Sequence, residues 1–554
     1  MSRSSRGDAP GEPTSRGASS DAAAAAPGGA SKLMGVLAVV VAVGVLAGGW
    51  LLSREQEFTV IVVSLDTTRP DHLSAYGYDR DTTPNLARLV REGTVFTEAR
   101  SSSSWTLPSH MSLFTGLPAD LHNVTYDFHE LDAGRRTMGE IFKEADYRTV
   151  GLFTAPYVHG TYGFDRGMDF YEAMTRAPMI HDMPPPDPMR PEQAKSQATL
   201  REFYSHQEVT SGYVADRARF ILKKRARARN LLFLHFFDPH YDYYPPPKVA
   251  QHFLDPDYDG PVTGEGITGR TDIIHPDMPE ADRRQLLSLY DAEIRFVDNQ
   301  LGHVIKTLEE EGKLGKTLVV ITGDHGEEFF EDGRIGHRMG LRDEVLRIPL
   351  IVWGPGLVPE GQVIDEPVAL YDVLPTVMDY AGLPSDPDIY GRSLRPLIDG
   401  DGLPARPTSS ALTFLHVDAP PYYTRHDAVV HDGMKYLRRM KVPWSKDDPT
   451  RLDNPPDLDS AEIAVYDLRN DPGEKQNLYA ERASDPRVAG IVREFDAEQS
   501  RQREALEGFQ PLSSGARANV TFDSITEQLR QTGYIDTALP SDEADPEPPA
   551  ADGD

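Results

Sequence analysis

The chain of 554 residues contains no cysteine. This absence excludes disulfide bonds, thiolate zinc sites, a cysteine nucleophile and an anchor built on an acylated cysteine. Any bound metal must therefore be held by oxygen and imidazole ligands. Positive charge is also scarce, because 57 Lys and Arg stand against 87 Asp and Glu and leave a formal net charge of −30. Nucleic-acid backbones bind to basic surfaces, so we expect no nucleic-acid partner.

Long apolar runs are scarce as well, and the exception lies at residues 33–52, which carry no charge. Residues 1–32 are rich in Ser, Ala, Gly and Pro, and we expect them to be a disordered cytoplasmic tail. The apolar run is long enough for one transmembrane helix, and the basic residues precede it. These features predict a single-pass membrane protein, anchored through this helix, with the folded part after it in an extracytoplasmic (periplasmic or extracellular) location. The alternative is a cleaved signal peptide.

The remaining sequence alternates between two patterns. Short apolar runs rich in β-branched residues predict buried strands at 58–65, 148–154, 231–237, 317–322 and 348–354. Apolar residues spaced by three or four positions predict helices at 84–92, 138–145, 212–228 and 284–308. This alternation predicts an α/β fold, with a sheet dominated by parallel strands and flanked by helices.

The pattern changes near residue 405. Shorter strands at 428–439 and 461–468, followed by a helix near 485–506, predict a smaller antiparallel subdomain. We therefore divide the folded chain into a catalytic domain over 56–404 and a C-terminal subdomain of the same fold over 405–510. Residues 511–554 end in an acidic stretch that we expect to be disordered. Nothing in the sequence indicates an oligomeric state.

Polar side chains follow three of the predicted strands. Asp66 comes directly after the first strand, Asp238 and His240 follow the strand at 231–237, and Asp324 and His325 follow the strand at 317–322. Functional groups gather beyond the carboxyl ends of strands in open α/β sheets, although Asp and His there also serve as ordinary turn and cap residues. Two carboxylates and an imidazole suit one divalent metal such as Zn, Mn, Mg or Ca.

Several stretches resemble the sulfatase family of the alkaline-phosphatase superfamily. They include VIVVSLDTTRPDHLSAYGY, TLPSHMSLFTGL, FFDPHYDYYPP, LVVITGDHGEEFFEDG and LRIPLIVWGPG, and the resemblance runs from Val60 to Leu478. It implies an alkaline-phosphatase/sulfatase-like fold and an enzyme that cleaves sulfate or phosphate esters at a metal-bound nucleophile. The substrate would be an anionic ester of a glycan, a lipid or a small molecule.

The resemblance also implies roles for single residues. Thr106 occupies the nucleophile position and also contacts the metal. His240 and His337 are placed like histidines that contact the ester oxygens and protonate the leaving group, and Arg69 is a weaker candidate for substrate binding. The implied metal ligands are Asp66, Thr106, Asp324 and His325.

The nucleophile segment departs from the family pattern. In true sulfatases a Cys or Ser at this position is oxidised to formylglycine, whereas this chain has Thr106, with His110 in place of the motif's arginine. Thr67 also replaces an aspartate that usually follows the first ligand. A threonine hydroxyl at a helix start and beside a metal can attack a phosphoryl group directly, which favours phosphate over sulfate esters. The structural alternative is that Thr106 merely caps the helix.

Three other functions stay open from the sequence. One is a phosphotransferase that moves a lipid headgroup to a glycan or lipid acceptor. Another is a true sulfuric ester hydrolase. The third is a catalytically silent family member that binds an anion.

Overall fold

The computed structural model describes residues 57–125, 129–174, 209–224, 229–267, 270–416, 422–443, 457–482 and 484–509. The predicted segments 1–32, 33–52 and 511–554 lie outside this part of the chain. Among the described residues, no helix is both long enough and apolar enough to cross a membrane. This finding contradicts the predicted localisation as a single-pass membrane protein. The prediction rested on the side-chain hydropathy of residues 33–52, which lie outside the described residues.

The larger sheet has eight strands, five of which were predicted. Their order is β11 (Gln362–Ile364), β2 (Thr94–Phe96), β10 (Leu350–Trp353), β7 (Thr317–Gly323), β1 (Phe58–Leu65), β6 (Arg229–Phe236), β4 (Arg148–Phe153) and β5 (Phe170–Ala173). The three strands that sequence reasoning missed, β2, β5 and β11, have only three or four residues each. Such short strands show too little periodicity to be recognised.

The predicted parallel arrangement is confirmed for most of this sheet. β1 runs parallel to both β6 and β7, and β4 runs parallel to β6 and β5. β10 instead runs antiparallel to β7 and β2. The chain between β7 and β10 holds only the hairpin of β8 (Glu328–Phe329) and β9 (Ile335–Gly336) and the short α11 (Asp343–Leu346). A parallel neighbour of β7 would need a crossover that returns the chain to the end of the sheet where β7 begins. Because this segment contains no crossover helix, β10 runs antiparallel beside β7.

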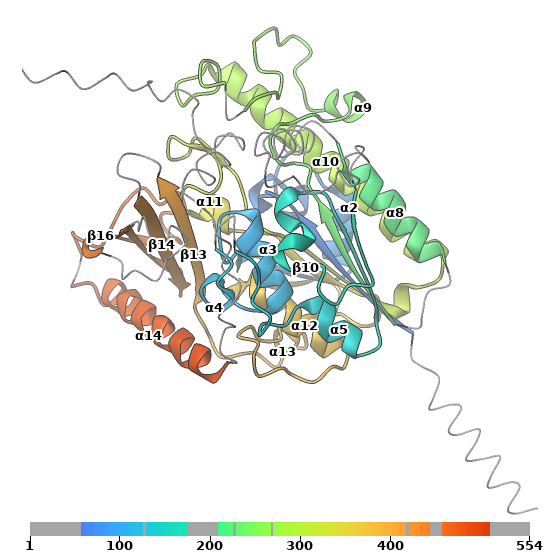
Figure 1. Cartoon of the computed structure of the whole chain (residues 1–554). Helices are drawn as coiled ribbons and strands as arrows, with labels where there is room; N and C mark the ends of the chain where they lie inside the picture. The colour runs from blue at the N-terminus through green and yellow to red at the C-terminus, as the bar shows by residue number, and fades with distance from the viewer. Residues whose placement is uncertain are drawn as a thin grey trace, which may run out of the picture. The chain divides into compact units, whose positions relative to one another are not determined.

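Helices cover both faces of the sheet, as predicted (Figure 1). On β1, Val60 and Val62 pack into one core and Ile61 and Val63 into the other, because alternate residues of a strand point to opposite faces. The first core includes residues of α3 (Thr106–Thr115), α5 (Met138–Glu144), α12 (Val373–Tyr380) and α13 (Arg395–Ile398). The second includes residues of α2 (Pro84–Arg91), α8 (Ser211–Lys223) and α10 (Glu280–Glu310).

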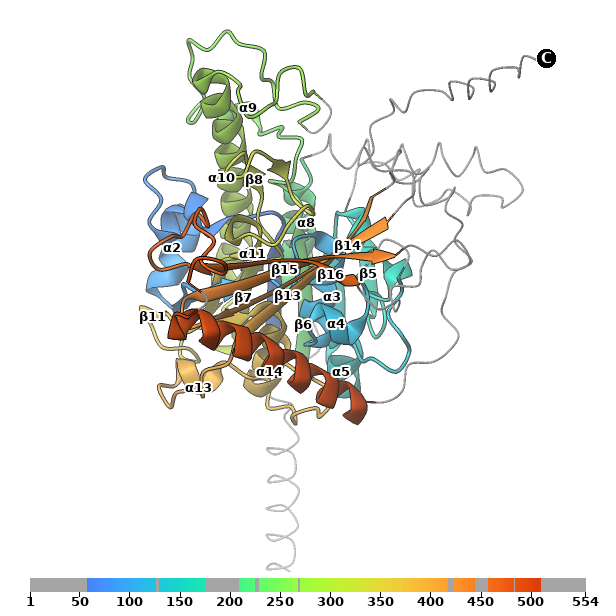
Figure 2. The same cartoon turned by 90° about the vertical axis from the view of Figure 1, so that its left-hand side faces the viewer.

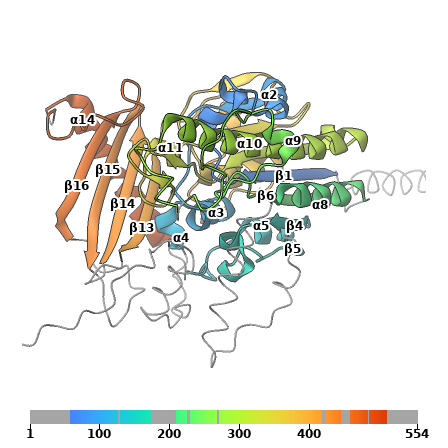
Figure 3. The same cartoon turned by 90° about the horizontal axis from the view of Figure 1, so that it is seen from above.

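The C-terminal antiparallel sheet is also present. Its strands follow chain order, as β13 (Thr408–His416), β14 (Tyr422–His431), β15 (Met434–Pro443) and β16 (Asp457–Asp467). α14 (Pro486–Gly508) lies along this sheet (Figures 2 and 3) and packs Val488, Ile491 and Phe495 against Tyr436 and Val465. The small sheet and its helix therefore share a core of their own.

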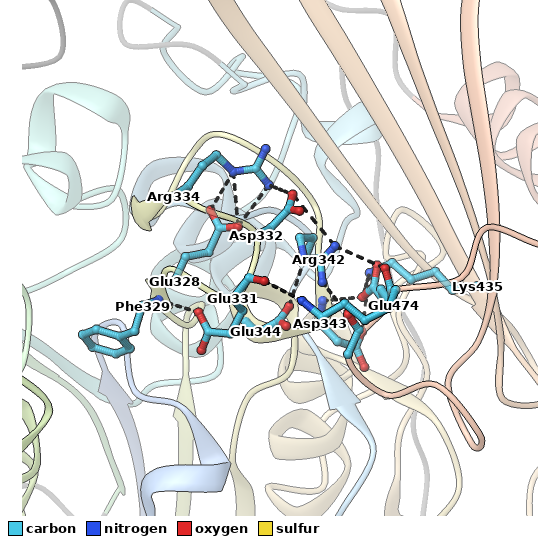
Figure 4. A network of polar contacts seen from close by, with 12 residues as sticks. Glu328, Phe329, Glu331, Asp332, Arg334, Arg342, Asp343, Glu344, Lys435 and Glu474 are labelled. Carbon is cyan, nitrogen blue, oxygen red and sulfur yellow. Dashed lines mark hydrogen bonds and ion pairs between the residues drawn. The ribbon is translucent and has the colours of Figure 1, made fainter. Parts of the chain in front are cut away.

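A buried polar network joins this C-terminal sheet to the segment between β7 and β10 (Figure 4). Lys435 on β15 is 0% exposed, and its Nζ donates to Glu474 Oε1 at 2.7 Å. The same carboxylate oxygen accepts the backbone N–H of Asp343 at 2.7 Å. Arg342 donates to the carbonyl of Gly473 at 2.6 Å. The loop after β16 thus fixes the end of the segment that carries Asp324, His325 and His337.

Candidate active site

The sheet register brings the predicted ligands together. Leu65 at the end of β1 pairs with Gly323 on β7, so the residues that follow, Asp66 and Asp324, lie beside each other. Asp66, Asp324 and His325 are each 0% exposed, and each offers a ligand atom within 4.8 Å of the others. Side chains that are far apart in the sequence therefore meet at one point, beyond the carboxyl ends of two neighbouring strands.

His325 presents a lone pair to the two carboxylates. Its Nδ1–H donates to the carbonyl of Gly326 at 2.9 Å, which leaves Nε2 unprotonated in the neutral ring. Nε2 lies 3.3 Å from Asp324 Oδ2 and 3.8 Å from Asp66 Oδ1. Burial, with a smaller contribution from His337, holds the pKa of His325 well below its usual range. A neutral imidazole in this tautomer is ready to ligate a metal through Nε2.

The two oxygens of the Asp324 carboxylate have different surroundings: Oδ1 accepts hydrogen bonds from the backbone, and Oδ2 faces His325. Oδ1 accepts the backbone N–H groups of His325 at 2.8 Å and Thr67 at 3.2 Å. Within the described residues, the buried Oδ2 accepts no hydrogen bond, although Nδ1 of His110 lies 3.4 Å away. Burial, followed by the charge of Asp66, raises the pKa of Asp324 well above its usual range. Two buried carboxylates and a neutral imidazole are stabilised when a divalent cation lies between them, so this donor set fits the implied metal.

Thr106 is the first residue of α3, whose N-cap is Trp105. Because Trp105 holds the N-cap position, Thr106 is not the capping residue of this helix. Thr106 Oγ1 instead lies 3.4 Å from His325 Nε2, on the side of the ring that faces the carboxylates. The positive end of the ten-residue helix adjoins the same point and favours negative charge there.

The two predicted substrate histidines lie beside the ligand cluster. The ring of His337 is 4.5 Å from that of His325 and 5.0 Å from that of His240. His337 donates from Nδ1 to Glu327 Oε1 at 3.0 Å, and His240 donates from Nδ1 to the carbonyl of Tyr241 at 2.7 Å. In both rings Nε2 is therefore on the opposite side from the anchoring contact.

Two sequence candidates have other partners. Arg69 binds Asp71, Glu331 and the carbonyl of Glu327, and it lines a polar cavity of about 280 Å³ that does not include the ligand cluster. Its contact with a substrate stays a prediction. Asp238 accepts the backbone N–H groups of Thr210 and Ser211 and so anchors the start of α8 rather than joining the cluster.

Sequence reasoning missed a group of buried residues around the cluster. His235 donates to Asp66 Oδ2 at 3.0 Å, and Glu327 holds His337. Arg338 is buried, and its guanidinium lies 3.8 Å from the ring centroid of Trp105, the residue that precedes Thr106 in the sequence. His235 lies inside an apolar strand, and Arg338 lies in an irregular segment. Ionisable residues are rarely buried without a partner, so the histidine within an apolar run was the signal that the sequence offered for His235.

Taken together, the fold and the cluster place two carboxylates and an imidazole where they could hold one divalent cation. A family model described as Sulfatase matches residues 59–383, and a second, described as N-sulphoglucosamine sulphohydrolase, C-terminal, matches residues 328–454. The chain therefore belongs to the sulfatase family of ester hydrolases.

Known proteins resemble the chain over different shares of their length. The matches cover 22% of arylsulfatase K from Danio rerio (37% identity over 22% of this chain) and 27% of steryl-sulfatase from Mus musculus (32% identity over 34%). The multifunctional alkaline phosphatase superfamily protein PehA of Trinickia caryophylli is 24% identical over 74% of this chain and 88% of its own. The crystal structure of the phosphonate monoester hydrolase of Agrobacterium radiobacter shares the fold, with a TM-score of 0.61 and 19% identity over 80% of this chain and 96% of its own.

Proposed function

We propose that this chain hydrolyses phosphate esters with Thr106 as the nucleophile. The observation that carries this proposal is the position of Thr106 Oγ1, 3.4 Å from His325 Nε2 and outside any capping role. Asp66, Asp324 and His325 would hold one divalent cation, for which zinc or manganese suits the mixed carboxylate and imidazole donors better than calcium does. Bound there, such a cation lowers the pKa of a neighbouring hydroxyl and offsets negative charge on the ester.

The chain's own residues account for the remaining steps. Thr106 gives its hydroxyl proton to solvent, Oγ1 attacks the phosphorus, the bond to the leaving oxygen breaks, and a phospho-threonine forms. His337 gives its Nε2 proton to that oxygen, because Glu327 at Nδ1 stabilises the charged ring from which the proton comes. Water then gives a proton to Nε2 of the neutral His337, and its oxygen attacks the phosphorus from the side opposite Thr106 Oγ1. The bond between phosphorus and Oγ1 breaks, phosphate leaves, and Oγ1 takes a proton from solvent, which restores Thr106. Thr106 lies at the N-terminus of α3, where the helix dipole favours an anionic substrate.

Sulfate esters are the second candidate, because several relatives carry sulfatase names and one similar structure holds D-glucosamine-2-N,6-O-disulfate. Threonine lacks the elimination route by which a formylglycine hydrate releases sulfate. We therefore expect phosphate monoesters or phosphonate esters to turn over faster than sulfate esters of the same leaving group.

A substrate panel tests the proposal directly. The full chain, loaded with zinc or manganese, is offered aryl phosphate, aryl phosphonate, aryl phosphodiester and aryl sulfate with one common leaving group. Metal-dependent release that is fastest for a phosphorus ester supports the proposal, and mass spectrometry of the quenched reaction should find phosphate on the peptide that contains Thr106. No turnover of any ester, with or without metal, overturns it.

A further inference from the structure

His235 is a buried histidine for which the proposed reaction has no chemical step. It lies inside β6, directly opposite Ser64 of β1, and it is 0% exposed. A histidine in the middle of an apolar strand is costly unless both of its ring nitrogens find partners. Its Nε2 lies 3.0 Å from Asp66 Oδ2, so one of the partners is a predicted metal ligand.

The other ring nitrogen fixes which tautomer is present. His235 Nδ1 lies 3.4 Å from the backbone nitrogen of Thr154 and 3.3 Å from its Oγ1, just beyond the end of β4. A backbone N–H can only donate, so Nδ1 must be the acceptor and Nε2 must carry the proton. His235 therefore donates to Asp66. The neighbouring strands β1, β6 and β4 set this geometry, because Asp66 directly follows β1, His235 lies in β6 and Thr154 directly follows β4.

The two carboxylates of the cluster are thus oriented by different means. Backbone N–H groups of His325 and Thr67 hold Asp324, whereas the side chain of His235 holds Oδ2 of Asp66. With Oδ2 held, Oδ1 of Asp66 is turned towards His325 Nε2, 3.8 Å away. Backbone donors cannot be removed by substitution, but His235 can.

We propose that His235 is a positioning residue that aims Asp66 at the metal. This inference rests on the proposed metal-dependent function. An outer hydrogen bond of this kind fixes the orientation and the ionisation of a ligating carboxylate, and losing it typically weakens metal binding about 10–100-fold. His235 acts on Asp66 and makes no contact with substrate, so its removal changes metal affinity first and turnover only through the metal.

Two substitutions test whether a donor at the position of Nε2 is needed. In His235→Gln the amide nitrogen can reach the position of Nε2 and still donate to Asp66, whereas in His235→Asn it reaches only the position of Nδ1. The full chain is stripped of metal and titrated with Zn²⁺ against a chromophoric chelator. We expect His235→Gln to bind zinc within about 3-fold of the unaltered chain and His235→Asn to bind about 10–100-fold more weakly.

His122 supplies the matched control, because it is a buried histidine that contacts Ser112 and Pro108 instead of a ligand. His122→Asn should leave zinc affinity unchanged. Equal affinities for His235→Gln and His235→Asn would overturn the positioning role. A second measurement does not depend on the folding of a variant: ¹⁵N-histidine NMR of the zinc-loaded chain should show the His235 proton on Nε2, and a proton on Nδ1 would overturn the inference. If the unaltered chain binds no divalent metal at all, the proposed function itself is wrong.

Discussion

The hydroxyl of Thr106 is the smallest feature on which the proposed chemistry depends. Thr106→Ala should reduce turnover by roughly 10³–10⁶-fold, because the other hydroxyl on the first turn of α3, that of Ser109, is bound to Ser101 and Ser103 and does not replace the lost nucleophile. Thr106→Ser should keep most of the activity, since it preserves the oxygen. Initial rates on the preferred aryl ester measure both effects.

Thr115 on the same helix is the control for Thr106. Its Oγ1 donates to the carbonyl of Met111 at 2.7 Å, so Thr115→Ala removes a buried hydroxyl of α3 without touching the ligand cluster. It should cost about 1 kcal/mol of stability and leave turnover unchanged. Full activity in Thr106→Ala would rule out the threonine nucleophile.

His122 should make stability fall in acid. Burial lowers its pKa to about 3 from the usual 6.5 of the exposed ring, and its Nδ1 accepts the backbone N–H of Val124 at 3.0 Å. Between these two pH values the unfolded chain binds a proton that the folded chain excludes. The stabilisation is therefore complete above pH 6.5 and is lost as the pH falls, by about 1.4 kcal/mol per pH unit.

The measurement for His122 is urea unfolding at a series of pH values between 4 and 7. His122→Gln removes the titrating ring. The free energy of unfolding of this variant should therefore fall less steeply in acid, and the difference in slope should be about 1.4 kcal/mol per pH unit, as expected for one proton. Identical slopes for the unaltered chain and the variant would contradict this account of His122.

Among the structural elements, the segment between β7 and β10 is the one that the rest of the fold must hold in place. It carries Asp324, His325 and His337. Its regular structure consists of a hairpin of two strands with two residues each and one turn of helix, so it has few backbone hydrogen bonds of its own. The buried Lys435 of β15 supports it through Glu474 and lies 3.7 Å from Asp343. The C-terminal sheet therefore stabilises the active-site segment without contributing a ligand.

Lys435→Met should destabilise the fold strongly. The substitution leaves the Glu474 carboxylate buried without its closest cation, and breaking a buried ion pair on one side typically costs about 3–5 kcal/mol. Lys441→Met is the control, because Lys441 is exposed on the same strand. Chemical denaturation of both variants measures the difference, and a loss below about 1 kcal/mol in Lys435→Met would show that the network is not a support.

At the scale of the whole molecule, metal binding and stability are linked. A metal that binds the folded chain alone stabilises it by about 2.7 kcal/mol at one hundred times its dissociation constant. Zinc or manganese should therefore raise the unfolding temperature of the full chain, and chelation should lower it again. In Asp324→Asn the metal-dependent rise should disappear, while the metal-free form should be as stable as before or more so, because the repulsion between Asp66 and Asp324 is gone.

Thermal scans with and without chelator distinguish these cases. A metal-free Asp324→Asn variant that is several degrees less stable than the metal-free unaltered chain would show that Asp324 is a structural residue rather than a metal ligand.

The sequence by itself determined the alternation of strands and helices, the positions of five central strands and the antiparallel C-terminal sheet. Those features follow from local periodicity, which reports burial one element at a time. It also placed Asp66, Asp324, His325 and Thr106 at the ends of elements, where a shared site is expected. Hydropathy alone, however, led to a predicted membrane localisation that the described structure contradicts.

Only the tertiary structure decided which of these polar residues meet. Strand register places Asp66 beside Asp324 and His235 opposite Ser64, and register depends on pairings between segments more than a hundred residues apart. The same pairings assign Asp238 to the start of α8 and Arg69 to an ion-pair network, although both looked like site residues in the sequence. Ligand geometry, tautomers and the support of the active-site segment by Lys435 are contacts across the fold, and no local pattern records them.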